Sequence, residues 1–366
     1  MKVLFNSNGN FKLGSVRIPF YAYKRQFEKM SDVEVFENDY DNYSNYDVLI
    51  APADSDFILK AKKENPSLVI CLTKPHHERL VSLPFSKISL RDIYYQLRLF
   101  YPESWSPKLK KLKSNIYCSD LVIADSPYLN LFFKSKNIDS VYLRLLEEIP
   151  DVETKFSSGD DLVFGYHGNY KHFNESMTYI LPELEKLSNE YNVTLKVMTN
   201  LSVAKLLYSE KIKIEYQEYS YPDIYNFLSD IDIGLVPNNI PVRNSLVDSL
   251  FHAFGCLFWK TDRKHDLILR YKQSVNAGRA YVFSQINKPF IACGVPDVCS
   301  DFGKVCGEYM PLDIETWKFS IRELSRNKDD RVRISRHLEY INDNEINLLI
   351  ESEKLKKCLI NKVERG

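Results

Sequence analysis

The sequence predicts an α/β protein made of two Rossmann-like domains, and three observations lead to this fold class. The chain has 366 residues, which is about twice the usual length of one domain. In residues 1–150, short β-branched runs alternate with longer segments of helical period, which is typical of a parallel sheet with crossover helices. The same alternation restarts after the polar stretch EIPDVETKFSSGDD, whose residues 151–160 we expect to form a linker.

The first domain, residues 1–150, should contain six strands with helices between them. Strands are expected at Lys2–Asn6, Val33–Phe36, Val48–Ala51, Leu68–Leu72, Leu121–Ala124 and Val141–Arg144. Helices are expected at Pro19–Met30 and Ser126–Lys136. Because strand–helix–strand units in one sheet have right-handed crossovers, we expect a doubly wound arrangement.

The second domain, residues 161–313, should repeat this architecture. Strands are expected in LVFGYHG, VTLKVMTN, IKIEYQEY, IDIGLVPN and FIACGVP, and an amphipathic helix in NESMTYILPELEKLSNEY. Residues 314–366 are polar and helix-forming, with Trp317, Ile321 and Leu324 at helical spacing. We expect this helical tail to cross back over both domains.

Composition limits the possible partners and the compartment. Lys plus Arg and Asp plus Glu are balanced at 49 each, so the chain lacks the basic field expected of a nucleic-acid-binding protein. The seven cysteines include no CxxC pair and are best interpreted as free thiols. The sequence starts with the strand-like MKVLFNSN and has no apolar run of membrane-spanning length, so we expect a cytoplasmic protein.

Ligands of open α/β sheets bind beyond the carboxyl ends of the strands, so the loops there are the first candidates for a site. After the first strand, residues 8–17 form a glycine-containing turn with Gly14 that runs into a helix and could face an anion. This turn lacks GxGxxG spacing, so a nicotinamide cofactor is not indicated. After the first strand of the second domain come His167, Gly168, Asn169 and Lys171, where glycine allows close backbone approach and lysine supplies charge.

A third loop, residues 270–279, combines small residues and cations with the start of a helix. Its sequence, RYKQSVNAGR, precedes the apolar helix AYVFSQI. Backbone amides, a helix dipole and guanidinium groups together favour a diphosphate. A helix start with ordinary surface cations is the alternative interpretation.

The order of these motifs resembles a known family. HGN after the first strand of the second domain, then YPDIYNFLSDIDIGLVPN and KPFIACGVPD, are similar to the C-terminal domain of GT-B glycosyltransferases of family 4. GNFKLGSVRIP and SDLVIADSPYLNLFFK resemble the corresponding N-terminal elements, so the likeness covers nearly the whole chain. The GT-B architecture consists of two Rossmann-like domains facing a central cleft.

The resemblance implies a nucleotide-sugar donor held mainly by the C-terminal domain and an acceptor held by the N-terminal domain. By analogy, Arg243, Lys272 and Arg279 would neutralise the leaving diphosphate, so neither a metal ion nor another cofactor is expected. The donor-binding residues implied are Gly14, His167, Gly168, Asn169, Lys171, Pro237, Asn238, Arg243, Ser274, Val275, Asn276, Ala277, Gly278 and Asp297. Asp297, after GVP, would contact the donor sugar or cap a turn.

The sequence departs from the family pattern at one pair of positions. Family 4 enzymes usually carry two glutamates eight residues apart before the G-x-P strand, and Ser274 and Val282 occupy those positions here. The identity of the donor and the stereochemical outcome therefore stay open.

Several other polar segments have both a functional and a structural interpretation. His76 and His77 follow the fourth strand and could orient or deprotonate an acceptor hydroxyl, or be plain loop residues. The DxD-like triplets at 39–41 and 54–56 are expected to be chance matches to a metal motif. The basic, aromatic segment LRLFYPESWSPKLKKLKSN could rest on anionic lipid or be a solvated helix face.

Together these observations predict sugar transfer from a nucleotide-diphosphate donor to a glycan or lipid-linked saccharide, with retention, in the synthesis of a bacterial surface polysaccharide. Two alternatives stay open. One is a nucleotide-sugar epimerase or hydrolase on the same architecture, and the other is a non-catalytic sugar-binding subunit, which the missing glutamates make conceivable. Fold analogy alone does not decide among them.

Overall fold

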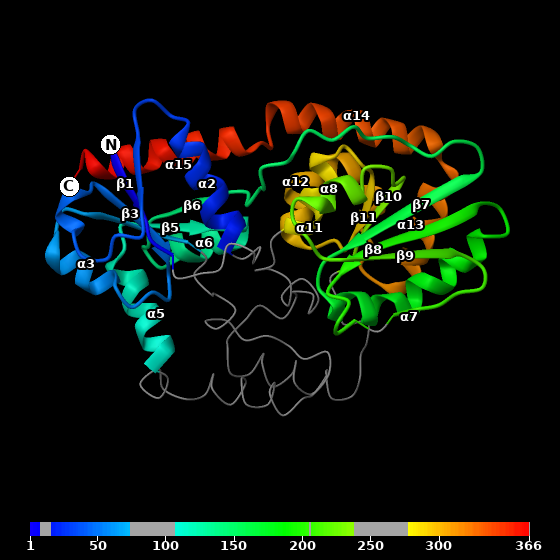
Figure 1. Ribbon diagram of the computed structural model, residues 1–366, viewed down its shortest axis with the longest axis horizontal. Coiled ribbons are helices and arrows are strands. Elements are labelled where there is room, and N and C mark those ends of the chain that lie inside the picture. Colours follow the sequence, from blue (N-terminus) through cyan, green and yellow to red (C-terminus); the bar gives the residue numbers. More distant parts are fainter. Residues whose placement is uncertain (8–15, 74–106, 205, 238–276, 366) are drawn as a thin grey trace. The chain divides into compact units, whose positions relative to one another are not determined.

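The computed structural model describes residues 1–7, 16–73, 107–204, 206–237 and 277–365, which form two compact units (Figure 1). Unit 1 comprises Met1–Glu148 and Ile346–Gly366, and unit 2 comprises Ile149–Val247 and Ala277–Glu345, each taken over its described residues. Both units are α/β structures built on a parallel sheet, which confirms the predicted fold class. Each unit is described separately below.

Unit 1 contains a sheet of six parallel strands in the order β2-β1-β3-β4-β5-β6. The strands are β1 (Lys2–Phe5), β2 (Glu34–Glu37), β3 (Val48–Pro52), β4 (Val69–Thr73), β5 (Leu121–Ala124) and β6 (Ser140–Tyr142). All six predicted strands are present, and β6 ends two residues before the predicted end at Arg144. The central strands are apolar on both faces because helices cover a parallel sheet on both sides.

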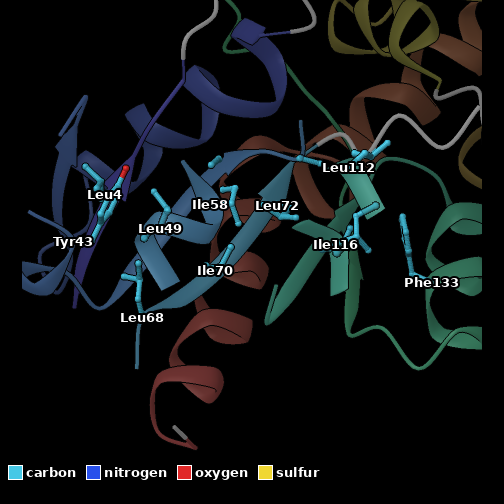
Figure 2. Packing of buried hydrophobic residues seen from close by; sticks show 14 of the residues in the cluster. Leu4, Tyr43, Leu49, Ile58, Leu68, Ile70, Leu72, Leu112, Ile116 and Phe133 are labelled. Atoms are coloured by element: carbon cyan, nitrogen blue, oxygen red, sulfur yellow. The ribbon is translucent and has the colours of Figure 1, made fainter. Parts of the chain in front are cut away.

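Helices α3 (Ile58–Glu64), α5 (Pro107–Cys118) and α6 (Pro127–Ser135) contribute to one hydrophobic core with the sheet (Figure 2). Leu4, Leu49, Ile70 and Leu72 from the strands belong to the same cluster as Ile58, Leu112, Ile116 and Phe133 from the helices. Helix α6 begins where Ser126 Oγ accepts a hydrogen bond from Leu129 N at 3.2 Å, and Pro127 occupies its first turn.

The predicted helix at Pro19–Met30 consists of two parts. A π-helical segment, η1 (Arg17–Ala22), continues into α2 (Tyr23–Glu28). Arg17 and Glu147 form a buried bidentate ion pair, with Nε to Oε2 at 3.0 Å and Nη2 to Oε1 at 2.9 Å. This pair joins the start of the helix to the chain that leaves β6. Helix α15 (Leu348–Val363) packs against α2 and β4.

Unit 2 contains five parallel strands in the order β11-β10-β7-β8-β9. They are β7 (Asp161–His167), β8 (Asn192–Thr199), β9 (Lys213–Glu218), β10 (Ile233–Val236) and β11 (Phe290–Ala292). The helices are α7 (Tyr170–Leu187), α8 (Asp223–Phe227), α11 (Gly278–Gln285), α12 (Pro296–Cys306), α13 (Ile314–Arg326) and α14 (Lys328–Asn344). The described residues also form two short 3-10 turns, η2 (Tyr43–Asn45) in unit 1 and η5 (Gly307–Tyr309) in unit 2.

Among the elements of unit 2 whose ends differ from the prediction are α7 and β11. The helix expected at 174–191 begins at Tyr170, directly after the loop that leaves β7. The strand expected at 290–296 ends at Ala292 because Pro296 already stands in the first turn of α12. Both differences bring a helix N-terminus closer to the end of a strand.

Helix α11 lies unusually close to β10. A Cβ atom at Gly234 would come within 2.6 Å of the Phe283 ring. The glycine therefore lets Phe283 of α11 pack directly on the strand backbone. This contact fixes the distance between the helix and the sheet at the edge where the candidate site lies.

The segment expected to be a linker, residues 151–160, is attached to unit 2. Lys155 N donates to Ser229 O at 3.1 Å, and Ser157 N donates to Asp232 Oδ1 at 2.9 Å. Lys288 Nζ donates to Lys155 O at 2.5 Å and lies 4.3 Å from the centre of the Phe156 ring. Burial lowers the pKa of Lys288 to about 8. Lys288, the first residue of the sequence KPF, is thus a buried lysine that binds residues 155 and 156 of the expected linker.

The C-terminal tail divides between the two units. Helices α13 and α14 pack within unit 2, where Trp317, Ile321 and Leu324 are buried, and α15 belongs to unit 1. An ion pair joins the tail to unit 1. Nη1 of Arg144, just after β6, lies 2.8 Å from Oε1 of Glu351 in α15. None of the helices in the described part of the chain is long and apolar enough to cross a bilayer.

Candidate functional site

The order of strands in unit 2 places a topological switch point between β7 and β10. From β7 the chain proceeds through β8 to β9 on one side of the sheet, and it returns to β10 and β11 on the other side. In open α/β sheets, ligands bind beyond the carboxyl ends of the strands at such a switch point. His167 and Gly168 stand at the end of β7, and Pro237 stands at the end of β10.

Arg279, in the first turn of α11, reaches both of these strand ends. Its Nη2 donates a hydrogen bond to the carbonyl oxygen of Pro237. Its aliphatic part lies against Gly168, because a Cβ atom there would be 2.7 Å from Arg279 Cδ. Gly168 has a φ of +124°, which favours glycine on conformational grounds as well. A guanidinium group, a glycine and a strand-end carbonyl are thus brought together from three segments far apart in sequence.

His167 supports the backbone of Arg279 and carries no charge at neutral pH. The side chain is 4% exposed, and its Nε2 lies 3.1 Å from Arg279 O. Since the carbonyl accepts, this ring nitrogen carries the proton. Burial lowers the pKa of His167 to about 3, and the ring contacts Phe283 edge-on at 5.1 Å. His167 therefore positions the backbone of Arg279 and contributes no positive charge.

The loop that follows His167 is fixed by hydrogen bonds to its neighbours. Gly168 N donates to Met198 O at 3.1 Å, and Thr199 Oγ1 donates to Gly168 O at 2.8 Å. Tyr166 Oη donates to Asn169 O at 2.8 Å. Burial raises the pKa of Tyr166 to about 12, although the charge of Arg279 opposes this effect. Three hydrogen bonds therefore fix the backbone of residues 168 and 169 beside β8.

Thr199 is a member of this arrangement that sequence reasoning missed. It is completely buried at the end of β8. A polar residue directly after Val197 and Met198 at the end of the strand was the available signal, because a buried hydroxyl needs a partner. That partner, the Gly168 carbonyl, is a neighbour only in the folded sheet.

Asp297 lies in the first turn of α12 and is fully buried. Its Oδ2 accepts a hydrogen bond from Ala277 N at 2.5 Å. Ala277 is itself 2% exposed and is the residue from which α11 starts. The contact with a donor sugar expected for Asp297 stays a prediction, whereas its contact with the backbone of Ala277 is present.

The remaining sequence-derived site residues divide into two groups. Gly278 opens α11, and Lys171 lies in the first turn of α7. The following residues lie outside the described part of the chain: Gly14, His76, His77, Asn238, Arg243, Lys272, Ser274, Val275 and Asn276. Of the two positions that differ from the glutamate pair of family 4, Val282 is buried in α11.

The acidic triplets of unit 1 are engaged in local contacts. Asp39 accepts from Tyr46 Oη at 2.7 Å and from the backbone of Asp41 at 3.0 Å, and these bonds lower its pKa. Asp56 pairs with Lys111 at 2.5 Å. Within the described ranges, no group of three or more His, Cys, Asp or Glu side chains is arranged to hold a metal ion.

Comparison with known proteins shows the fold. No protein-family model matches the chain, and no curated protein matches its sequence. Among solved structures, a mutant O-GlcNAc transferase of Thermobaculum terrenum has a TM-score of 0.55 at 10% identity, over 99% of this chain and 67% of that one. A putative UDP-N-acetylglucosamine 2-epimerase of Listeria monocytogenes has a TM-score of 0.55 at 9% identity, over 100% and 97%.

A third similar structure contains a bound ligand. A trehalose-6-phosphate protein of E. coli bound with UDP-2-fluoro glucose has a TM-score of 0.52 at 10% identity, over 98% of this chain and 92% of that one. These three proteins share the GT-B architecture, and the likeness shows that this chain has the GT-B fold. At 9–10% identity the likeness concerns the fold alone.

Proposed function

We propose that the protein is a glycosyltransferase that takes a sugar from a nucleotide-diphosphate donor bound by unit 2. The observation that carries this proposal is the position of Arg279 at the switch point, against Gly168 and on the Pro237 carbonyl. A cation held there can stabilise the negative charge that grows on the departing diphosphate. The GT-B structure bound with UDP-2-fluoro glucose supports the same class of donor.

In the proposed reaction, the bond between the anomeric carbon and the diphosphate oxygen breaks, and a bond to an acceptor hydroxyl forms. The nucleoside diphosphate leaves with the electron pair, and the acceptor proton is released. Arg279, Lys272 and Arg243 would compensate the charge of the leaving group, and His76 or His77 would orient the acceptor hydroxyl. We further propose a hexosyl transfer that retains the anomeric configuration, which NMR of the product would test.

A ligand screen followed by one substitution tests the donor site. Thermal shifts with UDP, GDP, dTDP and CMP, and with their sugars, should identify the preferred nucleotide. With that nucleotide, Arg279→Ala should reduce turnover about a hundredfold, the size of effect seen when one charge-stabilising donor is lost. Circular dichroism should show an unchanged fold.

The matched control is Arg326→Ala. Arg326 is an exposed arginine of the same unit, and its Nη2 pairs with Glu190 Oε1 at 2.5 Å. The control removes the same charge away from the switch point and should leave turnover unchanged. Equal turnover in the wild-type protein and in Arg279→Ala would exclude the proposed role of Arg279.

A nucleotide-sugar epimerase or hydrolase is the second candidate, because a putative epimerase is among the similar folds. Such an enzyme would convert or hydrolyse the donor when no acceptor is present. Chromatography of the donor after incubation with the protein alone distinguishes the candidates. Full conversion without acceptor would favour this second function over transfer.

We propose that the acceptor is a lipid-linked saccharide of a bacterial surface polysaccharide, used at the cytoplasmic face of the membrane. The support is the basic, aromatic character of α5, where Lys110 and Tyr117 are exposed, the tyrosine by 61%. Such side chains favour anionic headgroups. Co-sedimentation with phosphatidylglycerol vesicles but not with phosphatidylcholine vesicles is expected, and equal binding to both would contradict the idea.

A further inference from the structure

Asp297 is a buried carboxylate that connects α12 to the start of α11. No part of it is exposed, and its Oδ2 lies 2.5 Å from Ala277 N. Its own position in the first turn of α12 favours a negative charge, because the helix dipole is positive there. The start of α11 adds a second positive helix end to the same carboxylate. The charge is therefore stabilised by two helix N-termini.

Ala277 is the N-cap residue of α11, and its N–H has no acceptor at the N3 position, because Ala280 stands where a capping box would place Glu or Gln. Asp297 supplies that acceptor from α12. The carbonyl oxygen of Ala277 accepts from Ala280 N at 2.6 Å and from Tyr281 N at 3.1 Å. Ala277 therefore accepts the hydrogen bonds that close the first turn of α11, and its own N–H donates to Asp297. Arg279 lies inside that turn, two residues further along.

We propose that Asp297 is a positioning residue that fixes Arg279 for binding the diphosphate of the donor. This inference rests on the proposed function, in which Arg279 meets that diphosphate. The guanidinium must be held to within a fraction of an ångström for its full effect. Asp297 defines where α11 begins, and the side chain of Arg279 then reaches Pro237 O and covers Gly168. Asp297 therefore acts through Arg279 and does not touch the donor.

The same pair of helices supplies a matched control. Tyr281 Oη donates to Asp301 Oδ2 at 2.5 Å, which joins α11 to α12 at a second point, further from the helix start. Tyr281→Phe removes only this hydroxyl. If Asp297 merely held the helices together, Tyr281→Phe and Asp297→Ala should have the same consequences. If Asp297 positions Arg279, only the second change should alter ligand affinity.

The test measures by calorimetry how tightly the full-length protein binds UDP and UDP-glucose. If the thermal screen selects GDP or dTDP instead, that nucleotide and its sugar are used. Asp297→Ala should weaken binding of the nucleotide and the nucleotide sugar by the same factor, about tenfold, because the diphosphate is common to both. Asp297→Asn keeps an oxygen that can accept from Ala277 N, so it should restore affinity to within about threefold of the wild-type protein. Tyr281→Phe should bind like the wild-type protein.

A double variant separates positioning from general structure. In the Arg279→Ala background, Asp297→Ala should cause no further loss of affinity, because coupled residues are not additive. Additive losses would overturn the proposal. If Asp297→Ala does not fold, Asp297→Ser replaces it, since its hydroxyl keeps a polar group in the first turn of α12 but is one bond shorter toward Ala277. Asp297→Ser is expected to lose affinity like the alanine variant, and unchanged affinity would overturn the proposal.

The outcomes also distinguish this inference from the proposed function. A wild-type protein that binds none of the nucleotides removes the proposed donor site and the inference with it. Binding by the wild-type protein with undiminished affinity in Asp297→Ala removes the inference alone. A loss confined to the nucleotide sugar, with affinity for the nucleotide unchanged, would show a direct contact with the sugar and would equally refute positioning.

Discussion

The buried neutral histidine at the end of β7 makes a specific prediction about stability and pH. The folded-state pKa of His167 is about 3, against an ordinary value of 6.5. Between these two pH values the unfolded chain binds a proton that the folded protein does not bind. The free energy of unfolding should therefore fall as the pH decreases below 6.5, by about 1.4 kcal/mol per pH unit for this group alone. At pH 5 this loss amounts to roughly 2 kcal/mol relative to pH 7.5.

Replacement by glutamine isolates this effect. In His167→Gln, the side-chain amide nitrogen can still donate to the Arg279 carbonyl, but the side chain does not titrate. Urea unfolding at pH 7.5 and pH 5 should show a smaller loss of stability in the variant, by roughly 2 kcal/mol. The other histidines titrate in both proteins, so the comparison removes their contribution.

NMR provides a direct measurement of the same quantity. The Cε1–H signal that disappears in His167→Gln belongs to His167, and it should not shift between pH 7.5 and pH 5 in the wild-type protein. A midpoint near 6.5, or identical pH dependence of stability in the two proteins, would refute the reasoning. His167 would then be able to carry a charge beside the proposed diphosphate.

Two further substitutions, each with a control, test contacts within the two units. Gly168→Ala should weaken nucleotide binding about tenfold, because the new methyl would lie 2.7 Å from the arginine side chain that covers this glycine. The control is Gly159→Ala. Gly159 has a φ of +64°, and no atom lies within 4 Å of an added Cβ, so the substitution should lower the free energy of unfolding without changing the affinity in calorimetry. Glu351→Ala should destabilise unit 1 by about 2–3 kcal/mol in urea unfolding, since it removes the buried carboxylate that pairs with the partly buried Arg144. The exposed control, Glu353→Ala, should cost less than about 1 kcal/mol, and equal losses would contradict this interpretation.

Most of the strands of unit 2 could be predicted because their signal is local. Apolar runs such as those in β10 and β11 are buried on both faces of a parallel sheet, and this burial requires a continuous hydrophobic sequence. Element ends were predicted less well, since they depend on neighbours. Helix α7 starts at Tyr170 directly after a loop held by Met198 and Thr199, and neither contact is visible in the local sequence.

The sequence does not show which contacts the residues of the candidate site make. His167 and Asp297 look like polar loop residues in the sequence, and the resemblance to family 4 assigned both to the donor. In the structure both are buried and contact the backbone of the segment that carries Arg279. Burial converts a chargeable histidine into a neutral hydrogen-bond donor, because an unpaired charge is costly away from water.

The sequence by itself determined two α/β halves, a helical tail and a cation-bearing helix start after the fourth strand of the second half. These follow from periodicity and from glycine and proline positions, which act over a few residues. Only the tertiary structure decided that β10 lies beside β7, so that Pro237 and Gly168 meet around Arg279. Strand order is set by which hydrophobic faces pack together, and such pairing between distant segments leaves no mark on local sequence.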